Sequence, residues 1–219
     1  MNESIYSLVQ ELIYPLTLLI ILALFRKPLS RFIENLGKAN LKIDKTGIDL
    51  KTEAIGLIVE SSLNNIPSDE DNHRREYISN TVEGIETTIN KLNSNIDELK
   101  YKKILWVDDH PEWSFGERRA FETMGITIIS SFENNDALNK IKGQKFDLII
   151  SDYFSDQGHK KGLDLLKGTS RLHFNVPVIF YTSRATKSLK IEARENGAYG
   201  IVDSSGELSS LVLKSLIST

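Results

Sequence analysis

Two apolar runs in this chain are each followed by carboxylates. Asp108 and Asp109 come directly after the run 103–107, and Asp152 comes after the run 148–151. Short aliphatic runs that alternate with helical patterns are typical of buried strands in a parallel sheet. Ligand sites in such sheets lie beyond the carboxyl ends of the strands. We therefore expect these three acids to converge at one edge of a sheet.

The chemistry predicted for this acidic edge is cation binding. Carboxylates held close together repel one another, which raises their pKa values. A hard cation removes the repulsion, and Mg²⁺ prefers oxygen ligands. The chain has no cysteine and only four scattered histidines, which excludes disulfides and zinc sites of the usual spacing. Its net charge of −3 gives no bias toward nucleic acid.

The elements that must position these acids alternate regularly from Lys103 onward. The pattern indicates strands at 103–108, 126–130, 147–151, 176–181 and 199–202, and helices at 114–124, 133–142, 161–171, 185–195 and 206–217. Such alternation implies the α/β class, with a five-stranded parallel, doubly wound, flavodoxin-like sheet and right-handed crossovers. We expect this domain to span residues 102–219.

The N-terminal segment predicts a membrane anchor. Residues 5–25 are mostly apolar and are followed by Arg26 and Lys27. A spanning helix needs about 20 apolar residues, and a basic flank stays in the cytoplasm. We expect a single transmembrane helix within residues 1–27, in the inner or plasma membrane, with the C-terminal domain in the cytoplasm. A buried or interfacial helix is the alternative.

Two segments connect the anchor to the α/β domain. In the juxtamembrane segment 28–68, alternation around Gly47 predicts a small β-hairpin, and 52–63 fits a helix. Residues 69–101 contain an apolar heptad seam of about three repeats. The seam favours a coiled-coil stalk that makes a homo-oligomer, with a helix docked on the following domain as the alternative. Its residues are Ile78, Val82, Ile85, Ile89, Leu92, Ile96 and Leu99.

From Lys103 to its end, the chain resembles the receiver domain of two-component response regulators. The resemblance implies that the second strand forms one edge of the sheet and the fifth strand the other. The spacing of four motifs carries it: Val107-Asp108-Asp109, Ser151-Asp152, Phe180-Tyr181-Thr182-Ser183 and Gly197-Ala198-Tyr199-Gly200.

The resemblance also implies roles for individual residues. Asp152 would accept a phosphoryl group from a histidine kinase and would also be a ligand of Mg²⁺. Asp109 would bind Mg²⁺ directly, Asp108 would bind it through water, and the backbone carbonyl of Phe154 would be a further ligand. Thr182 would donate a hydrogen bond to the phosphoryl oxygen. The fold and site therefore imply a signalling protein that is not an enzyme in the ordinary sense.

The chain departs from the family pattern after the fifth strand, where receivers carry a lysine, usually followed by proline. Ser204 and Ser205 stand at those positions. No serine supplies the missing positive charge. The loop after Asp152 is also longer than usual. Its residues 159–161 carry His159, Lys160 and Lys161, for which positive charge near the site is one interpretation, but we expect a solvated loop. Other cations that could substitute are Arg184, Lys187 and Lys190.

Three functions are compatible with these features. The first is a membrane-anchored receiver protein, phosphorylated at Asp152, that relays its signal by protein contacts and has no DNA-binding output domain. The second is a pseudo-receiver that is not phosphorylated and serves as a recognition module of an oligomeric membrane effector. The third is a Mg²⁺-dependent hydrolase of phosphate esters, which is the weakest because no further acid or base is evident.

Overall fold

A five-stranded parallel sheet forms the centre of the computed structural model, which describes residues 50–68, 71–155 and 158–217. The strand order is β2-β1-β3-β4-β5, so β2 and β5 are the edges, as the resemblance implies. The strands are β1 (Lys103–Val107), β2 (Thr127–Ser131), β3 (Leu148–Ser151), β4 (Val178–Tyr181) and β5 (Gly200–Val202). In the registers, Val107 of β1 lies opposite Ser151 of β3.

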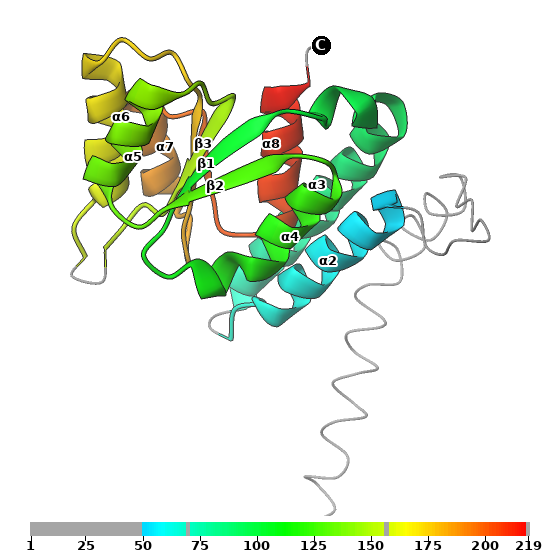
Figure 1. Ribbon diagram of the computed structural model, residues 1–219. Helices are drawn as coiled ribbons and strands as arrows, with labels where there is room; N and C mark the ends of the chain where they lie inside the picture. The colour runs from blue at the N-terminus through cyan, green and yellow to red at the C-terminus, as the bar shows by residue number, and fades with distance from the viewer. Residues whose placement is uncertain (1–49, 69–70, 156–157, 218–219) are drawn as a thin grey trace, which may run out of the picture. The chain divides into compact units, whose positions relative to one another are not determined.

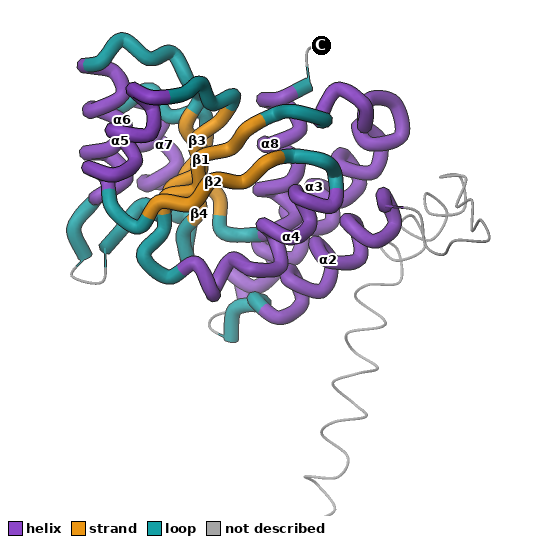
Figure 2. Tube along the Cα trace, viewed as in Figure 1, coloured by secondary structure: helices purple, strands orange, loops and turns teal. Residues whose placement is uncertain are grey.

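Helices cover both faces of this sheet, as Figures 1 and 2 show. One face carries α5 (Asn134–Gly143), α6 (Lys161–Arg171) and α7 (Lys187–Glu195). The other carries α4 (Phe115–Thr123), which follows the short 3-10 helix η1 (Pro111–Ser114), and α8 (Ser205–Leu216). Every expected strand and helix of this domain is found, with ends shifted by about two residues at most.

The alternation of side chains along each strand divides the core between the two faces. Leu105, Val107 and Phe180 belong to the apolar cluster under α5, α6 and α7. Trp106 faces the other way and is fully buried, with its ring centroid 6.2 Å from that of Phe121 on α4. Because both faces are covered, the strands read as continuous apolar runs rather than as alternating ones.

Two helices that precede β1, α2 (Leu50–Asn64) and α3 (Asp71–Leu99), form an outer layer over α4 and α8. We call this pair the α2–α3 layer. α3 packs against α8, and α2 packs against α4. The helix expected at 52–63 is therefore confirmed as part of α2.

The structure supports the docked alternative for α3 rather than a coiled-coil stalk over 69–101. Four apolar residues of the heptad seam are buried within this single chain: Ile85, Ile89, Leu92 and Leu99. Tyr77, which lies outside the seam, is also buried, and its hydroxyl donates a 3.0 Å hydrogen bond to the Ser62 carbonyl of α2. A heptad pattern and a docking face both repeat about every 3.5 residues, so the pattern alone does not separate the two arrangements.

Glycines set the close crossing of α3 over α8. A Cβ added to Gly84 of α3 would overlap the Gly206 carbonyl and lie 2.6 Å from the Glu207 nitrogen. A Cβ on Gly206 would in turn lie 2.9 Å from the Thr81 Cα. Gly84 costs helix propensity, about 1 kcal/mol relative to alanine, but it lets the two backbones touch.

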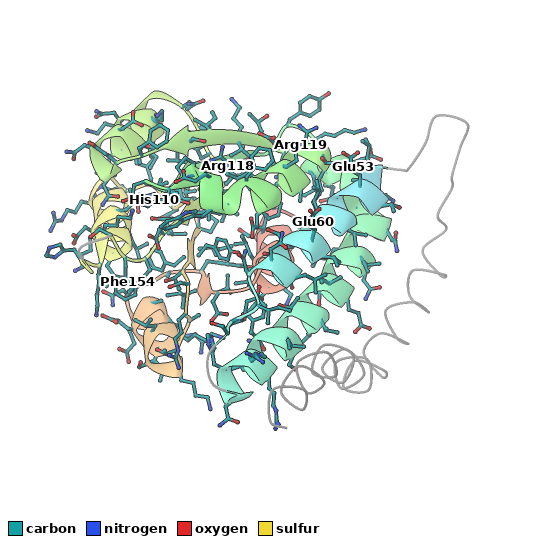
Figure 3. The ribbon with its side chains drawn as sticks, turned by 90° about the horizontal axis from the view of Figure 1, so that it is seen from below. Glu53, Glu60, His110, Arg118, Arg119 and Phe154 are labelled. Carbon is teal, nitrogen blue, oxygen red and sulfur yellow. The ribbon has the colours of Figure 1, made fainter. Side chains whose placement is uncertain are left out.

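Charge complements the apolar contact between α2 and α4. Figure 3 shows the acidic Glu53 and Glu60 on α2 and the basic Arg118 and Arg119 on the neighbouring helix α4. The residues buried on α2, among them Ala54, Ile55 and Ile58, provide the apolar part of this contact.

Some predictions concern residues outside those described. The transmembrane helix at 1–27 and the hairpin around Gly47 lie there. Among helices built from the described residues, none has the length and apolar character that a bilayer crossing requires.

Candidate functional site

The three acids meet at the carboxyl edge of the sheet because β1 and β3 are neighbouring parallel strands. Backbone hydrogen bonds continue past the strand ends and fix the positions of the acids. The Asp152 amide donates to the Val107 carbonyl at 3.1 Å, and the Asp108 amide donates to the Ser131 carbonyl at 2.9 Å. Asp108 and Asp152 therefore lie at the same edge of the sheet, and the Lys161 ammonium connects Asp109 to Asp152 there.

Asp152 is the most perturbed of these acids. Removal from water raises its pKa to about 6, and the nearby Asp108 adds to the effect. The charge of Lys161 and a 3.3 Å hydrogen bond from the Phe154 amide act in the opposite direction. At neutral pH the side chain is therefore mainly a carboxylate, the form that can act as a nucleophile.

Asp109 is paired with a lysine. The Lys161 Nζ donates a hydrogen bond to Asp109 Oδ1 and lies 3.8 Å from Asp152 Oδ2. Burial would raise the pKa of Asp109, but the hydrogen bond and charge of Lys161 outweigh it and lower that pKa. The Lys161 ammonium thus lies close enough to interact with the carboxylates of both Asp109 and Asp152.

Asp108 is held by its own loop. Its Oδ1 accepts a 2.9 Å hydrogen bond from the His110 amide, and its Oδ2 accepts a 3.2 Å bond from the hydroxyl of the buried Ser114. These partners orient the carboxylate without neutralising it. Figure 3 labels His110 and Phe154, which belong to the loops after β1 and β3.

The donor chemistry of this edge fits a magnesium ion. Asp109 and Asp152 both turn an oxygen toward one ammonium group, so a small cation in its place would face two carboxylates. Mg²⁺ is commonly held by one or two carboxylates, with water completing its shell. Among the described residues, however, no three His, Cys, Asp or Glu side chains surround a common point, because Asp108 is turned to its own loop. The residues fit the ion if it displaces the Lys161 ammonium from Asp109 and Asp152.

A cavity of about 450 Å³ opens beside the acids, lined by Asp108, Asp152, Phe154 and Thr182 among others. Thr182 is buried at the end of β4, and its amide donates to the Val202 carbonyl of β5 at 3.0 Å. The structure therefore brings Thr182 and Phe154 to the same site as the acids. Trp113 also lines the cavity and stacks on His110 with 4.1 Å between ring centroids.

The two serines at the lysine-proline positions are committed to other contacts. Ser204 is fully buried, and its hydroxyl accepts a 3.2 Å hydrogen bond from the Glu207 amide as the N-cap of α8. Ser205 donates a 2.6 Å bond to Oε1 of the buried Glu117, which also accepts a 2.7 Å bond from the Tyr181 hydroxyl. A polar network that includes Ser205 thus joins α4, β4 and α8.

The cation at the acids is Lys161, which belongs to the three loop residues that we expected to be solvated, and not Arg184, Lys187 or Lys190. Lys190 lies 3.7 Å from Glu207, and Lys187 and Arg184 line a second cavity, bounded on its other side by α3. Lys160 pairs with Glu192 of α7. Our assignment of 159–161 to a solvated loop is wrong for Lys161, whose side chain is only 18% exposed. The sequence signal that could have placed Lys161 at the acids is the following residue, Gly162, which allows α6 to start against Asp152.

Comparison with known proteins assigns the class. A family model described as the response regulator receiver domain matches residues 104–214, about half of the chain. The chain therefore belongs to the receiver domain family, as the motifs around Asp108, Asp152 and Thr182 indicated. Receiver domains are generally signalling modules, and they interact with histidine kinases and other signalling proteins.

Several solved structures are similar over the same region. The receiver domain of the Francisella response regulator 1452 is 26% identical, covering 51% of this chain and 95% of that one, with a TM-score of 0.46. The non-phosphorylated HemR receiver domain from Leptospira biflexa is 20% identical, covering 54% and 96%, with a TM-score of 0.47. Chemotaxis response regulator CheY4 of Vibrio cholerae is 21% identical, covering 53% and 100%, with a TM-score of 0.47.

Proposed function

We propose that this chain is a receiver protein in which Asp152 accepts a phosphoryl group from a histidine kinase and the change is relayed by protein contacts. The observation that carries the proposal is the placement of Asp152. It is a partly buried carboxylate that lines a cavity, with two further acids and a lysine beside it.

The proposed step is a simple displacement. An oxygen of Asp152 forms a bond to the donor's phosphorus while the bond from phosphorus to the leaving group breaks. Asp109, Asp152, Asp108 through water, and the Phe154 carbonyl would hold Mg²⁺. When bound, this ion supplies positive charge that neutralises the transferring group. The Thr182 hydroxyl would donate a hydrogen bond to a phosphoryl oxygen, since Thr182 lines the same cavity.

A route for the relay leads from this site to the α2–α3 layer. The Ala185 amide, three residues after Thr182, donates a 2.8 Å hydrogen bond to Asp203 Oδ2. The same oxygen lies 3.3 Å from Nε2 of His73 on α3. A shift of Thr182 toward a phosphoryl group would pull on this connection and change the docking of α3. The α2–α3 layer would then pass the signal to a partner.

We also propose that residues 1–27 anchor the protein to the membrane, with the receiver domain in the cytoplasm. The support is the apolar run with its basic flank. The full-length chain is expected to sediment with membranes and to resist a carbonate wash, whereas a variant that lacks residues 1–27 is expected to stay in the supernatant. Release of the full-length chain by the wash would contradict the anchor.

A phosphorylation assay tests the function. The full-length protein, incubated with Mg²⁺ and acetyl phosphate, should gain the mass of one phosphoryl group as acetate leaves. Asp152→Asn should abolish this adduct, because it removes the carboxylate oxygen of the proposed acceptor. The matched control Asp164→Asn removes an exposed carboxylate from α6 and should leave the yield unchanged.

The opposite result has a defined meaning. A folded wild-type protein that gains no adduct, from acetyl phosphate or from a kinase, would exclude the acceptor role. The pseudo-receiver would then be favoured. One observation supports the pseudo-receiver. Ser204 caps α8 and Ser205 donates to Glu117, so neither residue supplies a cation to the site.

A further inference from the structure

A cation built into the chain already occupies the acidic site. The Lys161 ammonium is hydrogen-bonded to Asp109 and lies 3.8 Å from Asp152 Oδ2, with 18% of its side chain exposed. Without it, the described structure would leave these carboxylates close together with their charges uncompensated. Opposite charges at about 4 Å in a partly buried site interact by several times thermal energy, which is enough to decide how the site is occupied.

The backbone fixes Lys161 in this position. α6 begins at this residue, and the next residue, Gly162, packs so tightly that an added Cβ would lie 2.7 Å from the Asp152 carbonyl oxygen and 2.8 Å from Phe180. The Asn134 side-chain amide on α5 donates a 2.8 Å hydrogen bond to the Lys161 carbonyl. The start of α6 is therefore clamped from two sides, and the lysine side chain extends from a rigid base.

The chain needs such a charge because the end of β5 lacks one. Ser204 is buried there as the cap of α8 and provides no cation. The neighbouring Lys160 is drawn away toward Glu192 of α7. Lys161 thus approaches the acids from the start of α6 rather than from the end of β5.

We propose that Lys161 is the intrinsic counter-ion of this site. It competes with the divalent cation for Asp109, and once displaced it pairs with the phosphoryl group on Asp152. The second half of this proposal rests on the proposed function, whereas the first half stands without it. The two halves predict opposite effects of one substitution, which a merely structural role for Lys161 would not produce.

The test replaces Lys161 by methionine, which keeps the apolar stem and removes the charge. Mg²⁺ binding is measured on the full-length protein by calorimetry and by the fluorescence of Trp113, which lines the cavity. Lys161→Met should bind Mg²⁺ about tenfold more tightly or better, because a competing positive charge is gone. Its yield of phosphoryl adduct from acetyl phosphate, at saturating Mg²⁺, should fall by about tenfold, because the phosphoryl charge loses a charge-assisted partner.

Two further variants make the result specific. Lys160→Met makes the same charge change one residue away and should alter Mg²⁺ affinity by less than about twofold. Lys161→Arg keeps the charge and should stay near the wild-type affinity. Thermal unfolding of each variant verifies that it is folded before its affinity is compared.

Each outcome supports or overturns one half of the proposal. An unchanged or weaker Mg²⁺ affinity in folded Lys161→Met would overturn the counter-ion role. Tighter Mg²⁺ binding with an unchanged adduct yield would confine Lys161 to that role and overturn the phosphoryl contact. If neither the wild type nor any variant forms an adduct, the proposed function fails, and the Mg²⁺ titration still tests the counter-ion.

Discussion

Gly84→Ala is expected to lower the free energy of unfolding by about 3 kcal/mol, near the upper end for an over-packed site. The added methyl group would overlap the Gly206 carbonyl and approach the Glu207 nitrogen to 2.6 Å. Both atoms belong to the backbone of α8, so no side chain can turn aside to make room. The helices must separate, which would uncover the apolar side chains between α3 and the receiver domain.

Chemical denaturation measures this loss, and amide hydrogen exchange locates it. Protection should fall across the α2–α3 layer before it falls in the central strands. The matched control is Gly56→Ala on α2, where a Cβ would meet nothing within 4 Å. That variant should be unchanged or more stable by up to about 1 kcal/mol, because alanine favours a helix. Equal stability of the two variants would refute the close crossing of α3 and α8.

Trp106→Ala is expected to cost about 3–5 kcal/mol, because it empties a large volume in the core under α4 and α8. Trp106 is fully buried, and its ring lies 6.2 Å from Phe121 and 6.5 Å, edge to face, from Tyr181. Tyr181 belongs to the polar network of Glu117 and directly precedes Thr182, so the cavity would also loosen the site.

Removal of the second tryptophan provides the control. Trp113 is 69% exposed, so Trp113→Ala should change stability by less than about 0.5 kcal/mol. The two variants delete the same atoms and differ only in burial. Urea denaturation measures the free energy of unfolding of both variants. A comparable decrease in the two would show that burial of Trp106 does not stabilise the core. The Trp113 variant should also lose the fluorescence response to Mg²⁺.

The α2–α3 layer restricts which surface of the receiver domain is open to a partner. Its contacts with α4 and α8 cover one helical face, whereas α5, α6 and α7 remain on the outside of the opposite face. A partner that needed the α4–α8 surface would first have to displace α3. In the relay proposed above, the contact of His73 with Asp203, close to the loop after Thr182, would couple the docking of α3 to phosphorylation at the site.

Much of the fold and site could be predicted from local patterns. Apolar runs that alternate with amphipathic helices define a parallel sheet by themselves, because both faces of each strand must be covered. The positions of Asp108, Asp109 and Asp152 at strand ends then follow from chain direction, since the carboxyl ends of parallel strands share one edge. The order of the strands followed from the family resemblance and was confirmed.

By itself, then, the sequence determined the α/β sheet, the acidic edge and the helical nature of residues 71–99. Only the tertiary structure decided that α3 docks on α8, because a heptad seam suits either partner and the choice depends on the complementary Gly206 surface. It also decided that Lys161 supplies the cation. The charge needed at Asp109 and Asp152 comes from a residue distant from β5 in the chain, and only packing at Gly162 brings it there.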